Sequence, residues 1–300
     1  MPENYRACRR EGCMRFALLG AAGYVAPRHI KAIHETGHEL VAVMDPHDAV
    51  GRLDAHFPEC AYFREFEVFD RFIEKERRAG RPIEWLSVCT PNYLHEAHVR
   101  WGLRMGMDVV CEKPLCLKPK NIAAIEALEE ETGKRVWSML QLRHSEEMIR
   151  LRGERLGAVK GDVMYWAPRG VWYQYSWKGD ERKSGGLLAN IGVHYFDMAI
   201  WLFGPVVQLE VFHSDPAHWT GVFFHERGAR FEWSLATRAP YSRAVVIDGT
   251  LHEFANFKES DLHTEAYRAI FRGEGTPISE ARKSLELIER IRQVARRDAA

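Results

Sequence analysis

The stretch MRFALLGAAGYVAPRH, residues 14–29, decides the expected fold. Its apolar run over residues 14–19 is typical of a short buried strand, and the run ends at Gly20. A helical pattern follows over about residues 25–36 and stops at Gly37. A strand, a glycine turn and a helix in this order predict the opening of a βαβ unit, from which parallel sheets are built.

Strand-like and helical stretches continue to alternate after this opening. Further buried-strand candidates are residues 40–44, 85–89, 108–111 and 136–140, and helical stretches lie around residues 63–79, 94–105 and 119–132. Strands that are joined by helices run parallel, with helices on both faces of the sheet. The pattern therefore predicts an α/β fold, a doubly wound Rossmann sheet, over about residues 14–140.

The pattern changes after about residue 155. Longer strand-like stretches follow one another at residues 159–166, 206–213, 219–224, 229–235, 244–247 and 251–254, and helical segments lie at residues 188–203, 262–271 and 279–296. Strands without intervening helices favour a largely antiparallel open sheet, and hence a second domain of the α+β class. We expect a flexible extension at residues 1–13, the Rossmann domain at 14–145 and the second domain at 146–300, with its last helix packed back on the first domain.

Composition limits the possible partners. The chain has 300 residues, of which 46% are hydrophobic, and its 42 basic and 42 acidic side chains cancel. A neutral chain has no long-range field to attract nucleic acid or an anionic membrane. Residues 1–13 are polar and lack the apolar core of a signal peptide. We therefore expect a cytoplasmic protein that binds neither nucleic acid nor membrane.

The six cysteines do not form a metal-binding pattern. They stand at positions 8, 13, 60, 89, 111 and 116, without a Cys-x-x-Cys pair or a zinc-like histidine spacing. Cys89 and Cys111 lie in apolar runs, where a thiol usually behaves as a small buried hydrophobe. This usage favours a reducing cytoplasm, and we expect no metal.

The glycine turn after the first strand is a candidate cofactor site. Small residues at Gly20, Gly23 and Ala26 let the backbone approach a pyrophosphate, whose charge the N–H groups at the helix start then hold. The spacing is one residue longer than G-x-G-x-x-G, and a tight turn without a ligand is the alternative. Asp45 ends the second strand, where a carboxylate accepts both adenosine ribose hydroxyls, and no Arg follows it directly to receive a 2′-phosphate. The pattern favours NAD over NADP, with contacts from Gly20, Gly23, Tyr24, Val25 and Asp45.

Two further motifs follow later strands of the same sheet. One is Thr90-Pro91-Asn92-x-x-His95 and the other is Glu112-Lys113-Pro114. Ligands of open α/β sheets bind at the carboxyl ends of the strands, which is where both motifs lie. For His95 the alternative is a helix-capping or surface residue, and for Lys113 a solvated charge. We expect cofactor contacts from Thr90, Pro91, Asn92, His95, Glu112 and Lys113.

A third motif lies on a predicted helix after Gly185-Gly186. Offsets of four and three residues place Asn190, His194 and Asp197 on one helical face, while apolar residues face the core. The alternative is an exposed polar face. Three polar groups on one stripe, directly after two glycines, favour a catalytic site.

The three motifs, in this order and at these separations, resemble the glucose-fructose oxidoreductase/inositol dehydrogenase (Gfo/Idh/MocA) family from about Arg15 to the C-terminus. Within it, the segments GAAGYVAPRH (20–29), SVCTPNYLH (87–95), CEKPL (111–115), LQLRH (140–144), SWKGDERKSGG (176–186), ANIGVHYFDM (189–198) and DLHTEAY (261–267) are similar to bacterial UDP-N-acetyl-2-amino-2-deoxyglucuronate 3-dehydrogenases of O-antigen sugar synthesis. The resemblance implies an NAD-dependent oxidation of a C3 hydroxyl on a nucleotide sugar, in a homo-oligomer (dimer or tetramer). A 2-oxo acid that reoxidises NADH is a further partner to consider.

By resemblance, Lys113 and His194 flank the reacting carbinol. A lysine ammonium stabilises the alkoxide that develops on oxygen, and a histidine accepts the hydroxyl proton near neutral pH. Asn190 and Asp197 are expected to orient the ring of His194. The alternative makes Lys113 the base, with a lowered pKa.

A set of cations and aromatic side chains supplies the candidate substrate contacts. They can hold a carboxylate and a diphosphate and stack on a base or sugar, or they belong to a loop packed on the sheet. The expected substrate-binding residues are Gln141, Arg143, Arg169, Trp172, Tyr173, Trp177, Lys178, Asn190 and His194, with Arg182 and Lys183 nearby. Two other readings remain open: a dehydrogenase of another sugar, inositol or an imine, and a non-catalytic NAD-binding regulator.

Overall fold

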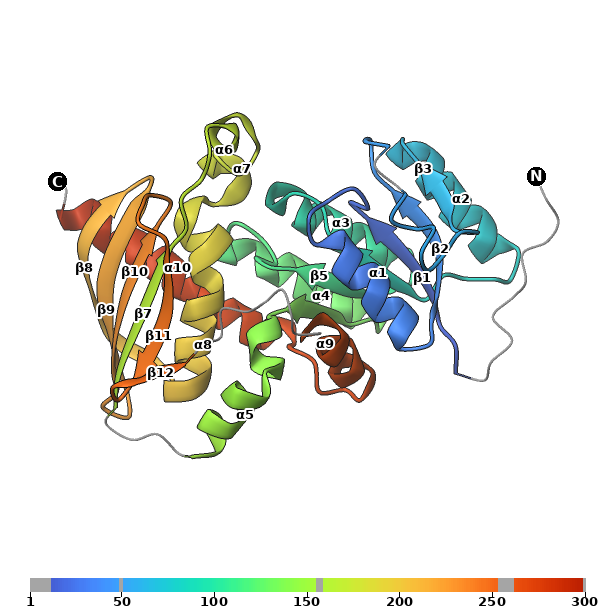
Figure 1. Cartoon of the computed structure of the whole chain (residues 1–300). Helices are drawn as coiled ribbons and strands as arrows, with labels where there is room; N and C mark the ends of the chain where they lie inside the picture. Colours follow the sequence, from blue (N-terminus) through green and yellow to red (C-terminus); the bar gives the residue numbers. More distant parts are fainter. Residues whose placement is uncertain (1–11, 49–50, 155–158, 253–261, 299–300) are drawn as a thin grey trace.

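The first sheet has the predicted parallel Rossmann arrangement. A computed structural model describes residues 12–48, 51–154, 159–252 and 262–298 of the chain (Figure 1). Its strands pair in parallel in the order β3-β2-β1-β4-β5-β6. They are β1 (Arg15–Leu19), β2 (Glu39–Met44), β3 (Ala61–Phe63), β4 (Trp85–Val88), β5 (Asp108–Glu112) and β6 (Val136–Met139).

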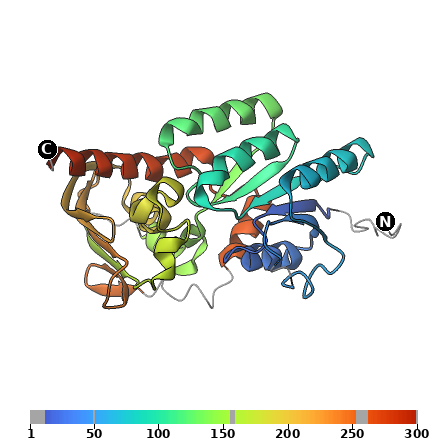
Figure 2. The same cartoon turned by 90° about the horizontal axis from the view of Figure 1, so that it is seen from above.

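The alternation of side chains along β1 explains how both faces of this sheet are covered. Ala17 and Leu19 pack in the core beneath α2 (Phe66–Arg78), α3 (His95–Arg104) and α4 (Ile122–Thr132). Phe16 and Leu18 pack in a second core with α1 (Ala26–Glu35) and α9 (Leu262–Phe271). Figure 2 shows the two groups of helices on opposite sides of the sheet.

One strand was missed by sequence reasoning. Residues 61–63 form β3 at the edge of the sheet, followed at Phe66 by α2, whereas the pattern predicted a helix from residue 63. All three residues of β3 are only partly buried, so they carry neither a continuous apolar run nor a helical period.

The second sheet is mostly antiparallel, as predicted, with one parallel pair between β7 and β10. Its order is β12-β11-β7-β10-β9-β8. The strands are β7 (Lys160–Trp166), β8 (Val206–Asp215), β9 (His218–His225), β10 (Arg230–Ala236), β11 (Ser242–Ile247) and β12 (Thr250–His252). Of the predicted strand at 251–254, residues 253 and 254 lie outside the described residues.

Helix α8 (Val193–Phe203) covers one face of the second sheet. Phe196 lies edge-on to Phe223 and to Trp233 of the sheet, with ring centroids 5.3 and 5.2 Å apart. The π-helical turn η4 (Leu188–Gly192) precedes α8. The stretch Glu181–Phe203 is long and apolar enough to span a membrane, but 72% of its most apolar window is buried inside the protein. It serves as a core helix of the second sheet.

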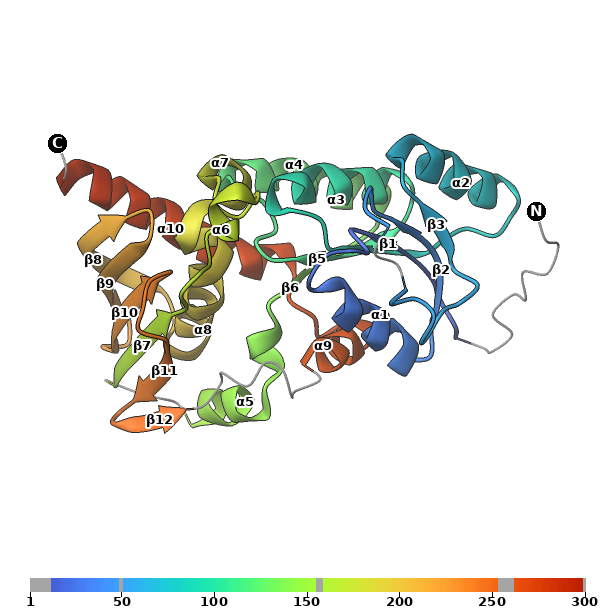
Figure 3. The same cartoon turned by 45° about the horizontal axis from the view of Figure 1, so that its top comes forward.

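Helix α10 (Ile278–Asp298) contacts both halves of the protein, as Figure 3 shows. Arg282 is ion-paired with Glu126 of α4, and Arg290 Nη1 donates to the Val206 carbonyl oxygen of β8 at 2.7 Å. The connecting segments are η1 (Asn92–Leu94), η2 (Pro119–Asn121), η3 (Gln141–His144), α5 (Glu146–Gly153), α6 (Trp172–Tyr175) and α7 (Glu181–Ser184).

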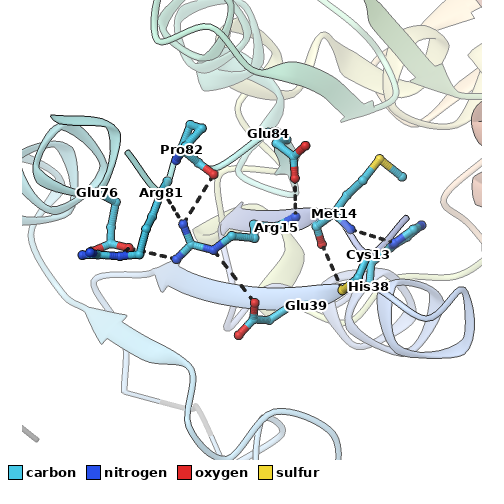
Figure 4. Close-up of polar contacts among 9 residues, drawn as sticks. All are labelled: Cys13, Met14, Arg15, His38, Glu39, Glu76, Arg81, Pro82 and Glu84. Atoms are coloured by element: carbon cyan, nitrogen blue, oxygen red, sulfur yellow. Dashed lines mark hydrogen bonds and ion pairs between the residues drawn. The ribbon is translucent and has the colours of Figure 1, made fainter. Parts of the chain in front are cut away.

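Arg15 secures the start of β1 to its neighbours. Its guanidinium pairs with Glu76 of α2 at 2.9 Å and lies 3.9 Å from Glu39 of β2, while its backbone N–H donates to Glu84 at 3.0 Å (Figure 4). These contacts hold the start of β1 against β2, against α2 and against the residue that precedes β4.

Candidate active site

The glycine turn is a close-packed cradle. Gly20 has φ +88°, and a Cβ there would lie 2.7 Å from backbone atoms of Cys89 and Thr90. A Cβ on Gly23 would lie 3.0 Å from the Gly20 carbonyl oxygen. Only glycine tolerates this conformation and this approach. The turn therefore lets its backbone pass close to the carboxyl edge of the sheet, as the approach of a dinucleotide pyrophosphate requires.

Asp45 braces this turn. One carboxylate oxygen accepts the Ala22 N–H and the other accepts the His47 N–H, both at 2.9 Å. The carboxylate thus lies at the end of β2 beside the turn, the position expected for a ribose contact. Arg52, which sequence reasoning missed because it does not adjoin Asp45, donates to the Gly23 carbonyl oxygen at 2.9 Å. The side chain of Tyr24 is 69% exposed. Val25 occupies the N-cap position of α1.

The Thr-Pro-Asn motif ties neighbouring loops together. Both ring nitrogens of His95 face backbone carbonyl oxygens, at 2.7 Å from Thr90 and 2.8 Å from Pro114. His95 is buried, so it joins the two strand-end turns and is not a surface residue. Asn92 donates to the Ser184 carbonyl oxygen at 2.8 Å and to the Asn190 side-chain oxygen at 3.3 Å. Pro91 is half-buried beside it.

Lys113 lies where the two halves of the chain meet. Its ammonium Nζ donates to the Asn190 carbonyl oxygen at 2.6 Å. Burial lowers the pKa of Lys113 to about 8, the Glu112 carboxylate opposes this shift, and the positive charges of Lys178 and Arg169 add to it. The lysine therefore stays mostly protonated at pH 7 but loses its proton at a lower pH than an exposed lysine does.

His194 lies near the same lysine, at the start of α8. Burial and the Lys113 charge hold the pKa of His194 well below its usual value. The imidazole is consequently neutral at pH 7, the form that accepts a proton. The π-helical turn ends just before it, so that Asn190 presents its carbonyl oxygen to Lys113 and its side chain to Tyr173.

Asp197 does not serve the histidine in the expected way. Its carboxylate forms a bidentate pair with Arg143, at 2.8 Å from Nε and 2.7 Å from Nη2, and both side chains are buried. Arg143 Nη1 also pairs with Glu280 at 3.2 Å. The geometry thus gives Arg143 and Asp197 a structural role that joins η3, α8 and α10, in place of the expected substrate contact and ring orientation. A guanidinium fork satisfies a buried carboxylate better than one imidazole N–H does.

Residues 169–178, here called the α6 segment, carry cations and aromatic rings that lie close to one another. Lys178 Nζ lies within 6 Å of the rings of Tyr24, Trp172 and Trp177, at 5.8, 5.9 and 5.7 Å. Arg169 lies 5.9 Å from the Tyr173 ring. Because Tyr24 belongs to the glycine turn, Lys178 brings this segment next to the expected cofactor site.

Two side chains here carry buried polar atoms that lack a hydrogen-bond partner among the described residues: Gln141 Oε1 and Arg169 Nε. Such atoms are costly unless a ligand or water satisfies them. Arg182 instead pairs with Asp180 at 3.0 Å and is 90% exposed at its side chain, while Lys183 lies over the Tyr93 ring at 5.7 Å. The structure therefore brings Arg169 and Lys178 toward Lys113 and leaves Arg182 at the surface.

The parallel sheet, the glycine turn and a buried lysine whose charge acts on a nearby histidine are features of a nucleotide-binding α/β protein. Residues 14–140 match the family described as an oxidoreductase family with an NAD-binding Rossmann fold, and residues 153–295 match the C-terminal alpha/beta domain of the same family. The chain belongs to the Gfo/Idh/MocA oxidoreductase family, and the expected cofactor, NAD, agrees with that description.

Two solved structures of one protein are similar throughout. They are the WlbA (WbpB) dehydrogenase from Thermus thermophilus with NAD and alpha-ketoglutarate (42% identity, 91% of this chain and 92% of that chain, TM-score 0.85) and the same dehydrogenase with NAD and UDP-GlcNAcA (41%, 92% and 93%, TM-score 0.86). Among curated proteins, D-glucoside 3-dehydrogenase of Escherichia coli is 29% identical over 81% of this chain and 67% of its own length. Inositol 2-dehydrogenase of Rhizobium meliloti is 27% identical over 64% of this chain, which spans 55% of that relative's length.

Proposed function

We propose that this oxidoreductase oxidises the C3 hydroxyl of a UDP-linked N-acetylated uronic sugar, UDP-N-acetyl-2-amino-2-deoxy-D-glucuronate, with NAD. The observation that carries the proposal is the cluster of Lys113, Lys178 and Arg169, whose charges act on one another beside His194. Three neighbouring cations favour an anionic substrate, such as a sugar that bears a carboxylate and a diphosphate. The likeness to a dehydrogenase solved with UDP-GlcNAcA supports this choice.

The chemistry divides between the two central side chains. NAD, held by the glycine turn and Asp45, would supply the hydride acceptor for the carbinol carbon. His194, kept neutral by its lowered pKa, takes the hydroxyl proton. Lys113, charged below a pKa of about 8, stabilises the negative charge that grows on oxygen. The bond from Lys113 to the Asn190 carbonyl fixes the ammonium at the junction while the substrate reacts.

The remaining polar groups are suited to the substrate's polar substituents. Arg169 Nε is buried and has no hydrogen-bond partner in the described part of the chain, and a guanidinium binds carboxylates and phosphates in a planar, bidentate manner. Gln141 Oε1, buried and without a partner among the residues that the structure describes, can accept from a sugar hydroxyl or the acetamido N–H. Trp172, Tyr173 and Trp177 supply aromatic surface for the base or sugar. Binding both ends of the substrate would place its C3 carbinol between the lysine and the histidine.

The setting of the enzyme completes the proposal. Among the described cysteines, Cys89, Cys111 and Cys116 are buried free thiols and Cys60 is a partly buried one, whereas Cys13 is disulfide-bonded. We infer a cytoplasmic homo-oligomer in the synthesis of O-antigen or other surface polysaccharide sugars. A 2-oxo acid also fits the cationic site, and the likeness to a dehydrogenase solved with alpha-ketoglutarate supports it as a second substrate, reduced to a 2-hydroxy acid.

The deciding experiment follows NADH absorbance after purified protein and NAD are mixed with UDP-N-acetylglucosaminuronate. We expect NADH to form, and to form more slowly with UDP-N-acetylglucosamine, which lacks the carboxylate. A separate arm adds 2-oxoglutarate and measures 2-hydroxyglutarate. Oxidation of inositol or a free sugar alone would replace the proposed substrate. NAD binding without turnover of any of these compounds would favour a regulator.

Arg169 offers a sharper test of substrate recognition. Arg169→Gln should raise KM for UDP-N-acetylglucosaminuronate by about 10- to 100-fold, because a charge-assisted hydrogen bond is worth roughly 1.5–3 kcal/mol. The exposed Arg182→Gln is the matched control and should leave KM near the wild-type value. An unchanged KM in Arg169→Gln would remove that side chain from the substrate site.

A further inference from the structure

A buried hydrogen-bond network is centred on Glu112, the residue that precedes Lys113 in the sequence. Glu112 Oε1 is 3.1 Å from His29 Nε2 and 3.1 Å from His263 Nε2. His29 is on α1, and His263, 151 residues away from Glu112 in sequence, is on α9. All three side chains are buried. Two helices from opposite ends of the chain thus converge on one carboxylate oxygen.

The protons in this network follow from its partners. An ionised carboxylate only accepts, so both Nε2 atoms carry the hydrogen. His29 Nδ1 then accepts the Tyr267 hydroxyl proton at 2.8 Å, and Ser87 donates to the Tyr267 oxygen at 2.6 Å. One side-chain atom each of His29, Glu112 and His263 lies within 4.8 Å of the other two, which is close enough to hold a metal ion. In this arrangement, however, the nitrogens act as donors to the carboxylate, and each of these hydrogen bonds has a donor and an acceptor.

The hydrogen bonds of this network keep the Glu112 carboxylate ionised, although burial favours its neutral form. Although burial raises the pKa of Glu112, the hydrogen bonds from His263 and His29 bring it well below its usual value. The second carboxylate oxygen accepts the backbone N–H of Lys113 at 3.3 Å. The carboxylate is therefore held between two imidazoles and the lysine that follows it.

The charge of Glu112 acts on the ammonium of Lys113. It raises the pKa of Lys113 against burial and against the positive charges of Lys178 and Arg169. The titratable and charged groups that face this pair come from every adjoining element: Arg28 and His29 of α1, Cys89 after β4, His95 of α3, Cys111 of β5, Arg169 and Lys178 of the α6 segment, His194 of α8, and His263 and Tyr267 of α9. Glu112 is the one carboxylate in this set.

We propose that His263 and His29 are positioning residues for Lys113: by holding Glu112 ionised and fixed, they set the pH range over which the lysine is charged. The inference rests on the proposed role of Lys113 in the reaction. Its consequence is that α9, an element from the far end of the chain, controls the protonation of a Rossmann-domain residue. Removing a histidine donor leaves a buried carboxylate that takes up a proton, and the lysine then loses its compensating charge.

The test measures the pKa of Lys113 directly, without substrate. Protein labelled with [ε-13C]lysine is titrated by NMR, and Lys113→Arg assigns the resonance. Glu112→Gln and His263→Phe should each lower the pKa of Lys113 by about one unit, a tenfold change in its dissociation constant. In the Glu112→Gln background, His263→Phe should add nothing, since its effect passes through the carboxylate.

Two variants complete the design. His263→Gln retains an N–H donor and should restore most of the wild-type titration, and His34→Phe, an exposed residue of α1, is the matched control that should leave it unchanged. A wild-type pKa in His263→Phe overturns the proposal. If that variant does not fold, Glu112→Gln decides, and an unshifted Lys113 resonance overturns it equally. Failure to oxidise UDP-N-acetylglucosaminuronate would refute the proposed substrate but would leave this titration unaffected.

Discussion

The ammonium Nζ of Lys113 lies 2.6 Å from the carbonyl oxygen of Asn190, so a side chain at the end of β5 is bonded to the π-helical turn that precedes α8. The first sheet supplies the lysine and the second domain supplies the turn that holds it. Asn92 spans the same junction to Ser184. The position of the ammonium beside His194 thus depends on how the two domains are packed.

Lys113→Met should bind NAD almost normally and lose turnover by about 10²- to 10³-fold, the usual effect of removing one group that stabilises developing charge. NAD affinity is measured by fluorescence titration and turnover by NADH formation. Lys120→Met, an exposed lysine of η2, serves as the control for loss of a positive charge. Turnover near the wild-type rate would remove Lys113 from the mechanism.

The pH dependence of kcat/KM distinguishes the two candidate bases. If His194 is the base and Lys113 the charged stabiliser, activity is present above the lowered pKa of His194 and falls as pH rises through about 8, where Lys113 loses its proton. The acidic limb then lies well below pH 6.5, and His194→Asn should abolish most of the rate together with that limb. A rate that increases through pH 8 would instead make neutral Lys113 the base.

Asp45→Ala should weaken NAD binding by about 10- to 100-fold, because a buried carboxylate contributes roughly 1.5–3 kcal/mol through a charged hydrogen bond. The exposed Asp48→Ala is the matched control. NADP should bind wild-type protein more weakly than NAD, since Asp45 repels a 2′-phosphate. A wild-type preference for NADP would contradict this assignment and would point to Arg52 as the phosphate contact, which Arg52→Ala would then test.

The buried pair of Arg143 and Asp197 should matter for stability. Arg143→Met leaves a carboxylate without its partner, and we expect a loss of about 3–5 kcal/mol in the free energy of unfolding. The double variant with Asp197→Leu should lose less than the sum of the single variants. Arg150→Met, which breaks an exposed pair with Glu154, should cost less than about 1 kcal/mol. Chemical denaturation measures all four, and additive losses would show that the pair is not coupled.

Local patterns predicted much of this protein. The strand, turn and helix at residues 14–36 follow from periodicity and from glycines whose conformation the turn requires, and the parallel sheet follows from their repetition. The carboxyl ends of successive strands meet at one edge, so Asp45, Thr90 and Lys113 were expected there. Residues 61–63 were missed because an edge strand of three partly buried residues has no periodic signal.

The amino-acid sequence by itself determined the two sheets, the glycine turn and the presence of an acidic, a basic and an imidazole group near one edge. The tertiary structure alone decided their partners. Helical spacing grouped Asp197 with His194, but packing gave the carboxylate to Arg143, 54 residues earlier. Likewise, α9 was predicted as a helix, yet only its packing on α1 brought His263 to Glu112. Periodicity reports which face of an element is buried, whereas the partner of a buried charge depends on which distant segment packs against that face.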